Sequence, residues 1–509
     1  MNTILEQFQK KINGTFSFFD RMIIKGYLFP FFSVSGRMYF LSQMNLLLKD
    51  FSAYANQMTN DLVSYVEKMA AKEGRPLVYL SSSQISKEEN ARKILLENPV
   101  EQGLICILSV VEGCQTLQPV KNSSGLLELR SVTRKCKYYY FYYLDKEFGF
   151  MHVKLQTWFP FLIQVYINGR EMMKHVFDKN GITYRMYDNS FSEISDIPKA
   201  QELADQFDSK KLCRQLDFFA HKVNPYLDML ETIFHQGYHW SVDQCEFATD
   251  VMFESREALE DIYPSLVGHA FYDFKCTDVF SFLGRKLNAK FLGEAVSDYR
   301  KRPVGWRIKF KLKSNSIKMY DKFNCLRIEM TINDPKEFKV YKEVHHKDRT
   351  ASMQWVPMGK SIANLYRYAE ISKTANKRFL DSMCHVIPQK SVEEEINHVC
   401  QKKKVKGKTY SGYNVWSPET FHLFETICDG RYLIRGFTNR DIRQSLYKKG
   451  AESAKSRGKM SREFSKLRGH GLIRKIPHSR RYLVSDKGRR VMGALIETKR
   501  KIYPELAAQ

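Results

Sequence analysis

The amino-acid sequence predicts an α/β fold class of mixed α+β character, distributed over several domains. The chain has 509 residues, which exceeds one compact domain and suggests roughly two to four. Hydrophobic residues make up 43% of the chain and aromatic residues 13%, enough to build packed cores. Strand-like runs of aromatic and β-branched residues occur beside stretches with helical periodicity, so both kinds of element are expected.

The first 200 residues are expected to form an N-terminal α/β domain. A β-like run from Phe16 to Leu28 precedes a helical stretch from Ser35 to Ala71. The clearest hairpin joins Lys137–Leu144 to Phe150–Thr157 through the turn at 145–149, because both segments are rich in strand-forming residues. No internal repeat is evident.

Residues 201–405 are expected to form a central α+β domain, which is the candidate catalytic domain. Its first half has helical periodicity, and antiparallel strands follow at Trp306–Leu312, Ser316–Asp321 and Leu326–Ile332. The basic, glycine-containing segment Gln401–Lys408 predicts a linker, so the last domain is placed at residues 410–509.

The distribution of charge indicates a nucleic-acid partner. The formal net charge is +25. Residues 401–509 contain 27 Lys and Arg against 9 Asp and Glu, a net charge of +18, and the rest of the chain carries only +7. A basic surface attracts polyanions, and its concentration at one end is typical of a dedicated binding domain rather than of charge spread for solubility.

The cysteines and the hydrophobic segments indicate a cytoplasmic protein without a membrane role. The ten cysteines are scattered singly with no CxxC pair, which predicts reduced core thiols. The most apolar stretch, Trp158–Ile167, is too short to span a bilayer.

The last hundred residues have the pattern helix, helix, basic helix, two-stranded hairpin, helix. Ser417 and Thr438 are expected to cap the first two helices. The third, from about Lys459 to Arg468, turns Met460, Phe464 and Leu467 inward. The strands at 472–476 and 481–484 then precede a helix from Asp486 to Thr498.

This pattern resembles bacterial winged-helix regulators of the MarR type, whose third helix enters the DNA major groove while the wing follows the backbone. The resemblance covers roughly the last 90 residues and implies a winged helix-turn-helix that binds double-stranded DNA. The DNA contacts that it implies come from the helix (Ser461, Arg462, Ser465, Lys466, Arg468) and the wing (Arg474, Lys475, His478, Arg480, Arg481). The alternative is a winged helix that contacts protein.

A candidate catalytic centre lies in two adjacent predicted strands. Lys318, Tyr320 and Lys322 share one face of the first strand, and Arg327 and Glu329 share one face of the second. If the two faces coincide, a tyrosine, a carboxylate and several cations meet. Phosphodiester chemistry uses such a set: a tyrosine attacks phosphorus, carboxylates hold Mg²⁺ or Mn²⁺, and cations offset the developing charge.

The same segment resembles rolling-circle replication initiators that lack a His-hydrophobe-His motif. Their pattern of aromatic-Tyr-acid-Lys followed by hydrophobic-Arg-hydrophobic-Glu matches Met319–Lys322 and Leu326–Glu329, with Met319 in place of the aromatic residue. The resemblance implies that Tyr320 nicks DNA, with Lys322 and Arg327 as catalytic cations. It also implies that Asp321 and Glu329 hold Mg²⁺ or Mn²⁺. The alternative is a sheet hairpin whose charges are simply solvated or paired.

Two functions follow from these observations. The first is a DNA-nicking enzyme of a mobile or plasmid-like element, acting in replication initiation or transposition. The second is a non-catalytic winged-helix transcriptional regulator with a large N-terminal assembly or sensor region. Double-stranded DNA is the expected partner, and single-stranded DNA, RNA and a homodimer remain open.

Overall fold

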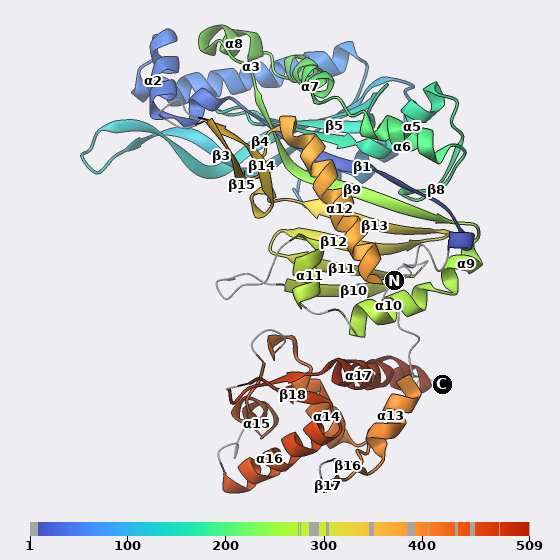
Figure 1. Cartoon of the computed structure of the whole chain (residues 1–509). Coiled ribbons are helices and arrows are strands. Elements are labelled where there is room, and N and C mark those ends of the chain that lie inside the picture. Colours follow the sequence, from blue (N-terminus) through green and yellow to red (C-terminus); the bar gives the residue numbers. More distant parts are fainter. Residues whose placement is uncertain are drawn as a thin grey trace. The chain divides into compact units, whose positions relative to one another are not determined.

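The computed structural model describes residues 9–507, except positions 273, 275, 285–294, 302–304, 346–350, 384–391, 406, 433–435, 448–452 and 478. It is a mixed α+β structure with a large sheet, as the sequence predicts (Figure 1). Contacts divide the chain into two compact units. We call Asn13–Glu254 with Lys313–Asn376 the sheet unit, and Met1–Ile12, Ser255–Leu312 and Lys377–Gln509 the C-terminal unit.

The sheet unit contains most of the strands. They are β1 (Ile12–Tyr27), β2 (Leu77–Tyr79), β3 (Gly103–Lys121), β4 (Leu127–Asp145), β5 (Gly149–Gln156), β6 (Ile163–Asn168), β7 (Tyr184–Tyr187), β8 (Ser190–Ile194), β9 (His239–Phe253), β12 (Asn315–Lys322), β13 (Cys325–Ile332), β14 (Lys339–His345) and β15 (Ala351–Pro357). The large sheet has the order β12-β13-β9-β1-β6-β5-β4-β3-β2 within this unit. Each of the strands β3 to β6 pairs antiparallel with the next one along the chain, and β2 pairs with β3 in parallel.

The helices of the sheet unit precede, follow or connect these strands. They are α2 (Val34–Gln43), α3 (Phe51–Lys72), α4 (Lys87–Glu97), α5 (Gly169–Lys179), α6 (Ile197–Asp205), α7 (Ser209–Val223), α8 (Leu227–Phe234) and α12 (Leu365–Met383). Helix α12 has a buried face, on which the Asn376 amide donates to the Phe247 carbonyl and to Thr249 Oγ1 of β9. These bonds fix α12 across the middle of the sheet (Figure 1).

The sheet contains a topological repeat. The long strand β1 pairs antiparallel with β6, the last strand of the meander β3-β4-β5-β6. In the same way, the long strand β9 pairs antiparallel with β13, the last strand of a second meander. A two-stranded hairpin follows each meander, β7–β8 in the first half and β14–β15 in the second. Strands β1 and β9 are neighbours at the centre. The domain boundary expected near residue 200 therefore falls inside the sheet unit, because strands from both sides of it form one sheet.

The aromatic run Tyr138–Tyr143 on β4 belongs to the core on both faces of the sheet. All six residues are buried. Tyr140 and Tyr142 pack in a cluster with Ala91 of α4, and Tyr143 contacts Phe219 of α7. These rings are therefore not exposed for stacking on bases.

The C-terminal unit combines a strand pair with two groups of helices. Its elements are α9 (Arg256–Glu260), α10 (Tyr263–Tyr272), α11 (Cys276–Phe282), β10 (Ala295–Lys301), β11 (Trp306–Leu312), α13 (Val392–Cys400), β16 (Lys403–Val405), β17 (Lys408–Tyr410), α14 (Pro418–Ile427), α15 (Asn439–Tyr447), α16 (Ala454–Gly469), β18 (Ile473–Lys475), β19 (Tyr482–Val484) and α17 (Asp486–Ala507). The predicted linker at 401–408 contains strand β16 and the start of β17, which pair antiparallel.

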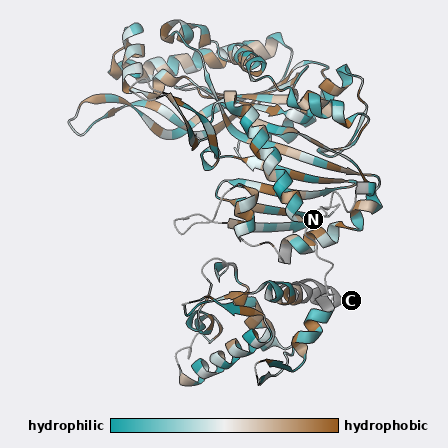
Figure 2. Ribbon diagram, viewed as in Figure 1, coloured by the Kyte–Doolittle hydropathy of each residue, from teal (hydrophilic) through white to brown (hydrophobic). Residues whose placement is uncertain are grey.

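The last hundred residues have a hydrophobic core of their own. Its buried members run from Val399 to Ile496 and come from all the helices between them. The helices carry hydrophilic residues beside these hydrophobic ones, as Figure 2 shows. Within the part of the chain that the structure describes, no helix has both the length and the apolar character needed to cross a membrane.

Candidate active site and nucleic-acid interface

The predicted hairpin that carries Tyr320 is confirmed. Strands β12 and β13 pair antiparallel, with Tyr320 directly opposite Arg327 and Lys318 directly opposite Glu329. Directly paired residues project from the same face of a sheet. The two predicted faces therefore coincide, and Tyr320 lies on the face that carries Lys318, Arg327 and Glu329.

Arg327 is the centre of a buried cluster of charges. Its side chain is fully buried, and its guanidinium contacts Asp20 Oδ2 at 2.8 Å, Asp250 Oδ1 at 3.1 Å and Glu329 Oε2 at 3.7 Å. Asp20 belongs to β1 and Asp250 to β9, and Asp250 is the direct partner of Arg327 in the register of β9 and β13. An isolated buried charge is costly, so a guanidinium held among carboxylates is the arrangement that burial requires.

Lys318 extends this cluster toward Glu246. Its ammonium lies 2.6 Å from Glu329 Oε1 and 3.5 Å from Glu246 Oε1. Arg21 donates to the other oxygen of Glu246, Oε2, at 2.6 Å. We call the whole set the charge network; it consists of Asp20, Arg21, Glu246, Asp250, Lys318, Arg327 and Glu329.

The pKa values in the charge network follow from burial and pairing. Burial raises the pKa of Asp250 to about 6, although the Arg327 charge opposes the rise. Burial also disfavours ionised Glu329, but the charges of Lys318 and Arg327 outweigh it and lower the pKa of this carboxyl. Glu329 is therefore held as a carboxylate, the form that binds a cation.

Three carboxylates of the network are close enough to share a metal ion. Oxygen atoms of Asp20, Glu246 and Glu329 all lie within 4.8 Å of one another. They come from β1, β9 and β13, which are adjacent strands. Both carboxylate oxygens of Asp20 are buried without a hydrogen bond, although Arg170 and Arg327 lie within ion-pair distance. Such oxygen ligands suit Mg²⁺ or Mn²⁺.

The structure does not bring Asp321 to Glu329. Alternate residues of a strand face opposite sides, so Asp321 points away from the face that carries Tyr320. Its carboxylate accepts a hydrogen bond from the Phe323 backbone N–H at 3.1 Å, and the side chain is buried. Asp20 and Glu246, rather than Asp321, are the carboxylates that surround Glu329.

Lys322 lies beside Tyr320. Its ammonium is 5.2 Å from the centre of the Tyr320 ring and forms an ion pair with Asp188. Tyr320 is half-buried. The ring thus lies between the buried network on one side and the more open end of β12, where Phe323 is exposed, on the other.

Helix α16 has the two faces that its sequence predicts. Met460, Phe464 and Leu467 are buried. Ser461, Arg462, Ser465 and Arg468 are exposed. Lys466 differs from this set, because it is only half-exposed and its ammonium lies 3.8 Å above the Tyr413 ring. Part of the role of Lys466 is therefore packing within the fold.

The hairpin β18–β19 carries the remaining predicted DNA contacts. Arg474, Lys475 and Arg480 are exposed. Arg481 is exposed too, but its guanidinium donates to the Gly436 carbonyl at 2.9 Å, which ties the hairpin to the segment before α15. His478 lies outside the described residues.

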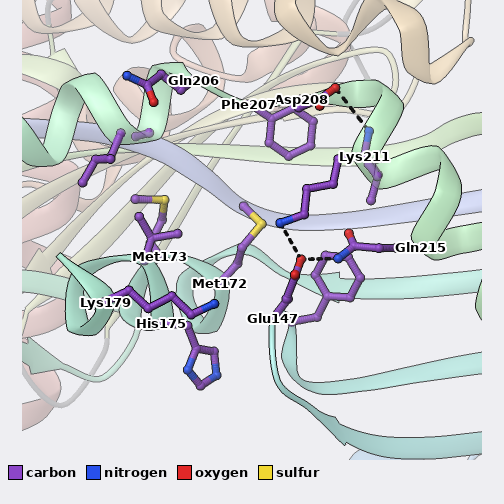
Figure 3. Close-up of a pocket in the computed structure, with 15 residues that line it drawn as sticks. Glu147, Met172, Met173, His175, Lys179, Gln206, Phe207, Asp208, Lys211 and Gln215 are labelled. Carbon is purple, nitrogen blue, oxygen red and sulfur yellow. Dashed lines mark hydrogen bonds and ion pairs between the residues drawn. The ribbon is translucent and has the colours of Figure 1, made fainter.

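A separate pocket of about 170 Å³ lies between α5, α6, α7 and the β4–β5 turn (Figure 3). Lys211 and Gln215 both bond to Glu147 at its wall, and Met172 and Met173 supply apolar surface. None of the predicted site residues lines it. The pocket therefore adds nothing to the candidate active site.

Sequence reasoning missed the carboxylates on β9, and it gave no reason to place Asp20 of β1 beside Glu329. Their signal is an acidic residue within an apolar strand, as in FSFFDRMII around Asp20 and CEFATDVMF around Glu246 and Asp250. A charge in such a run must find a buried partner.

Comparison with known proteins leaves the chain without an assigned family: no protein-family model matches it, and no curated protein or solved structure does.

Proposed function

We propose that this protein is a DNA-nicking enzyme in which Tyr320 is the nucleophile and carboxylates of the charge network bind a divalent metal ion. One observation carries the proposal: Tyr320 lies directly opposite Arg327, whose guanidinium contacts Asp20 and Glu329. A potential nucleophile, a cation and a carboxylate group thus share one face of one sheet.

The reaction fits the chemistry of these side chains. The Tyr320 hydroxyl oxygen attacks phosphorus and loses its proton to solvent, and a phosphotyrosyl bond forms. One ester bond from phosphorus to deoxyribose breaks, and the departing oxygen takes up a proton. Lys322, beside the Tyr320 ring, contributes positive charge where the phosphate becomes more negative.

Asp20, Glu246 and Glu329 would hold Mg²⁺ or Mn²⁺. The bound ion would supply Lewis acid chemistry by polarising a phosphate oxygen. Lys318 bridges two of these carboxylates and lowers the pKa of Glu329, so it prepares the site for a cation without contacting the DNA.

The C-terminal segment would select the DNA. Its order of helices and hairpin, its separate core and the exposed cations of α16 support a winged helix-turn-helix that places α16 in the major groove. This combination fits a replication initiator or a transposase-like enzyme of a mobile element.

A second candidate function is a non-catalytic DNA-binding regulator. The observation that favours it is that Asp20, Asp250, Glu246 and Glu329 each have a Lys or Arg partner, so the network is charge-compensated without a metal. In this case the charges would fix the order of strands in a large sheet, and the α16 face would act alone.

One experiment separates the two functions. Supercoiled DNA from the genetic neighbourhood of the chain is incubated with the full-length protein and Mg²⁺ or Mn²⁺. The enzyme predicts nicked circles with protein attached to one DNA end, and it predicts none with EDTA. Binding without nicks under every metal condition would support the regulator.

A further inference from the structure

The basic segment that the sequence predicts as a linker forms a hairpin of lysines, which we call the lysine hairpin (residues 402–410). Its strands β16 and β17 pair antiparallel. Five of the seven residues from 402 to 408 are lysine, and no Asp or Glu occurs from residue 396 to 418. Lys402, Lys404 and Lys408 are exposed. Among the residues that the structure describes, none of these three lysines has a carboxylate within ion-pair distance.

The lysine hairpin is docked against the end of α16 (Figure 1). The Tyr410 ring lies so close to Gly469, the last residue of α16, that a Cβ on this glycine would be 2.5 Å from the ring. The His470 imidazole, one residue further on, bonds through Nε2 to the Ser411 carbonyl at 2.9 Å. The hairpin is therefore held in a defined position on α16 and is not a free linker.

The hairpin lies on the side of α16 that carries predicted DNA contacts. Gly469 follows Ser465 by four residues and Arg462 by seven, and such spacings place residues on one face of a helix. Tyr410 packs against that face at its C-terminal end. The exposed side chains of Arg462 and Ser465 therefore lie in line with the hairpin along α16.

The positive charge of the hairpin is reinforced by its neighbours. Burial lowers the pKa of the His470 imidazole, although its bond with the Ser411 carbonyl opposes this effect. The charges of Lys403 in the hairpin, Lys466 of α16 and Lys487 of α17 lower the same pKa further. Like charges gathered in this way destabilise a fold, so folding does not account for them. A bound polyanion would remove the repulsion.

We propose that the lysine hairpin is a second wing, which contacts the phosphate backbone of the same DNA duplex as α16 through Lys402, Lys404 and Lys408. Lys404 pairs with Thr409 and Lys408 with Val405, so these two lysines project from opposite faces of the hairpin. This arrangement suits successive phosphates of a strand rather than one small anion. Phosphate contacts position a protein on DNA and carry no base preference.

Duplex DNA is the favoured occupant for two reasons. The hairpin adjoins the DNA-facing side of α16. In addition, Tyr410 is the one aromatic residue of the hairpin sequence, and its ring packs against Gly469, so it is not available to stack on an unpaired base. The inference rests on the proposed function, because it takes from it the placement of α16 in the major groove.

The test uses the full-length protein and a labelled duplex of random sequence in EDTA. Binding is measured by fluorescence anisotropy over a series of salt concentrations. The triple variant Lys402→Ala, Lys404→Ala, Lys408→Ala is expected to bind more weakly. Its slope of log K against log salt should be smaller by up to about 2.7, because each phosphate contact contributes roughly 0.9.

The matched control is the triple variant Lys68→Ala, Lys72→Ala, Lys210→Ala. It removes the same charge from exposed positions of α3 and α7 and is expected to leave the slope unchanged. An equal reduction by both triple variants would show that only net charge matters, and it would overturn the proposal. An unchanged slope in the correctly folded hairpin variant would do the same. So would a loss confined to single-stranded oligothymidine, which would assign the hairpin to unpaired strands.

Lysine acetylation needs no substitution and covers the case in which the hairpin variant fails to fold. Excess duplex is expected to protect the three hairpin lysines of the wild type from an acetylating reagent, as measured by mass spectrometry, while Lys68 and Lys72 stay reactive. Full reactivity of the hairpin lysines in the complex would overturn the proposal.

Arg462→Ala reports separately on α16. If this variant binds duplex more weakly and the hairpin variant does not, the DNA-binding role of α16 stands and the second wing is wrong. No duplex binding by the wild type would overturn both. Since neither measurement contains a metal ion, an enzyme that failed to nick would leave these tests intact.

Discussion

Arg327 and Asp250 are direct partners across strands β13 and β9, and the guanidinium Nη1 contacts both carboxylate oxygens, at 3.1 and 3.2 Å. Both side chains are fully buried. The pair links two strands of the second half of the topological repeat. The contact of Arg327 with Asp20 of β1 links the second half to the first. Arg327 therefore stabilises the centre of the sheet whether the protein is a nicking enzyme or a regulator.

Replacing Arg327 by leucine should destabilise the protein by about 3–5 kcal/mol, because Asp250 would remain buried without its cation and Asp20 would keep only Arg170. Chemical denaturation measures the change. Arg300→Leu is the control: Arg300 also pairs with an aspartate on a strand, but it is exposed, so a change within about 0.5 kcal/mol is expected. Equal effects of the two substitutions would contradict the buried ion pair.

The stability of the protein should contain a pH-dependent contribution from Asp250. Its pKa is about 6 in the folded chain against an ordinary 3.8, so the folded state binds the proton more tightly. The stabilisation that comes from protonating Asp250 is complete below about pH 4. It is lost as the pH rises to about 6 and is absent above that pH. Relative to Asp250→Asn, which cannot titrate, the wild type should lose up to about 3 kcal/mol across this range. Parallel denaturation curves at each pH check this, and a constant difference between the two proteins would refute it.

Tyr320→Phe should abolish any covalent DNA–protein adduct while the fold survives, because only the hydroxyl group is removed from a half-buried ring. Denaturing gels detect the adduct after incubation with supercoiled DNA and Mn²⁺. Glu329→Gln should also abolish cleavage and should weaken Mn²⁺ binding, while DNA binding through the C-terminal segment is kept. Full nicking by the phenylalanine variant would exclude the tyrosine and leave water as the nucleophile.

Local parts of this site could be predicted from sequence. The hairpin at Ser316–Ile332 follows from period-2 alternation and a short turn, and the same alternation correctly places Tyr320 with Arg327. The alternation also argues against Asp321 as a metal ligand beside Glu329, because Asp321 is one position from Tyr320 and faces the other way. The acidic residue expected from the resemblance is at that position, but the geometry separates it from Glu329.

The remainder depends on which strands are neighbours. Asp20 and Arg327 are brought together because β1 lies beside β9 and β9 beside β13. No local pattern encodes that order, since strand neighbours are fixed by the packing of the whole sheet. For the same reason, the expected division at residue 200 separates two halves of one structure. The C-terminal elements were easier to predict, because their caps and apolar faces lie close together in sequence.

Arg462 and Lys466 should respond differently to substitution, although both lie on α16. Arg462 is exposed, so Arg462→Ala should weaken DNA binding by about 1–3 kcal/mol without changing the melting temperature. Lys466 lies over the Tyr413 ring, so Lys466→Ala should lower both the affinity and the melting temperature. Differential scanning calorimetry and anisotropy with duplex DNA measure the two effects. Identical behaviour of the variants would show that the Tyr413 contact adds no stability.

The C-terminal segment should fold and bind duplex DNA alone, provided that α13 is included. Val399 is fully buried in the C-terminal core, and Ile396 packs against the same cluster. Arg490 of α17 also pairs with Glu395 at 2.8 Å. A fragment of residues 392–509 should therefore give a cooperative thermal transition, whereas a fragment of residues 410–509 should melt at a lower temperature. The affinity of the longer fragment for duplex DNA should fall steeply with salt, because each phosphate contact adds roughly −0.9 to the slope of log K against log salt. A salt-independent complex would show that the exposed cations of α16 do not contact phosphates. Equal melting temperatures of the two fragments would show that α13 adds no stability.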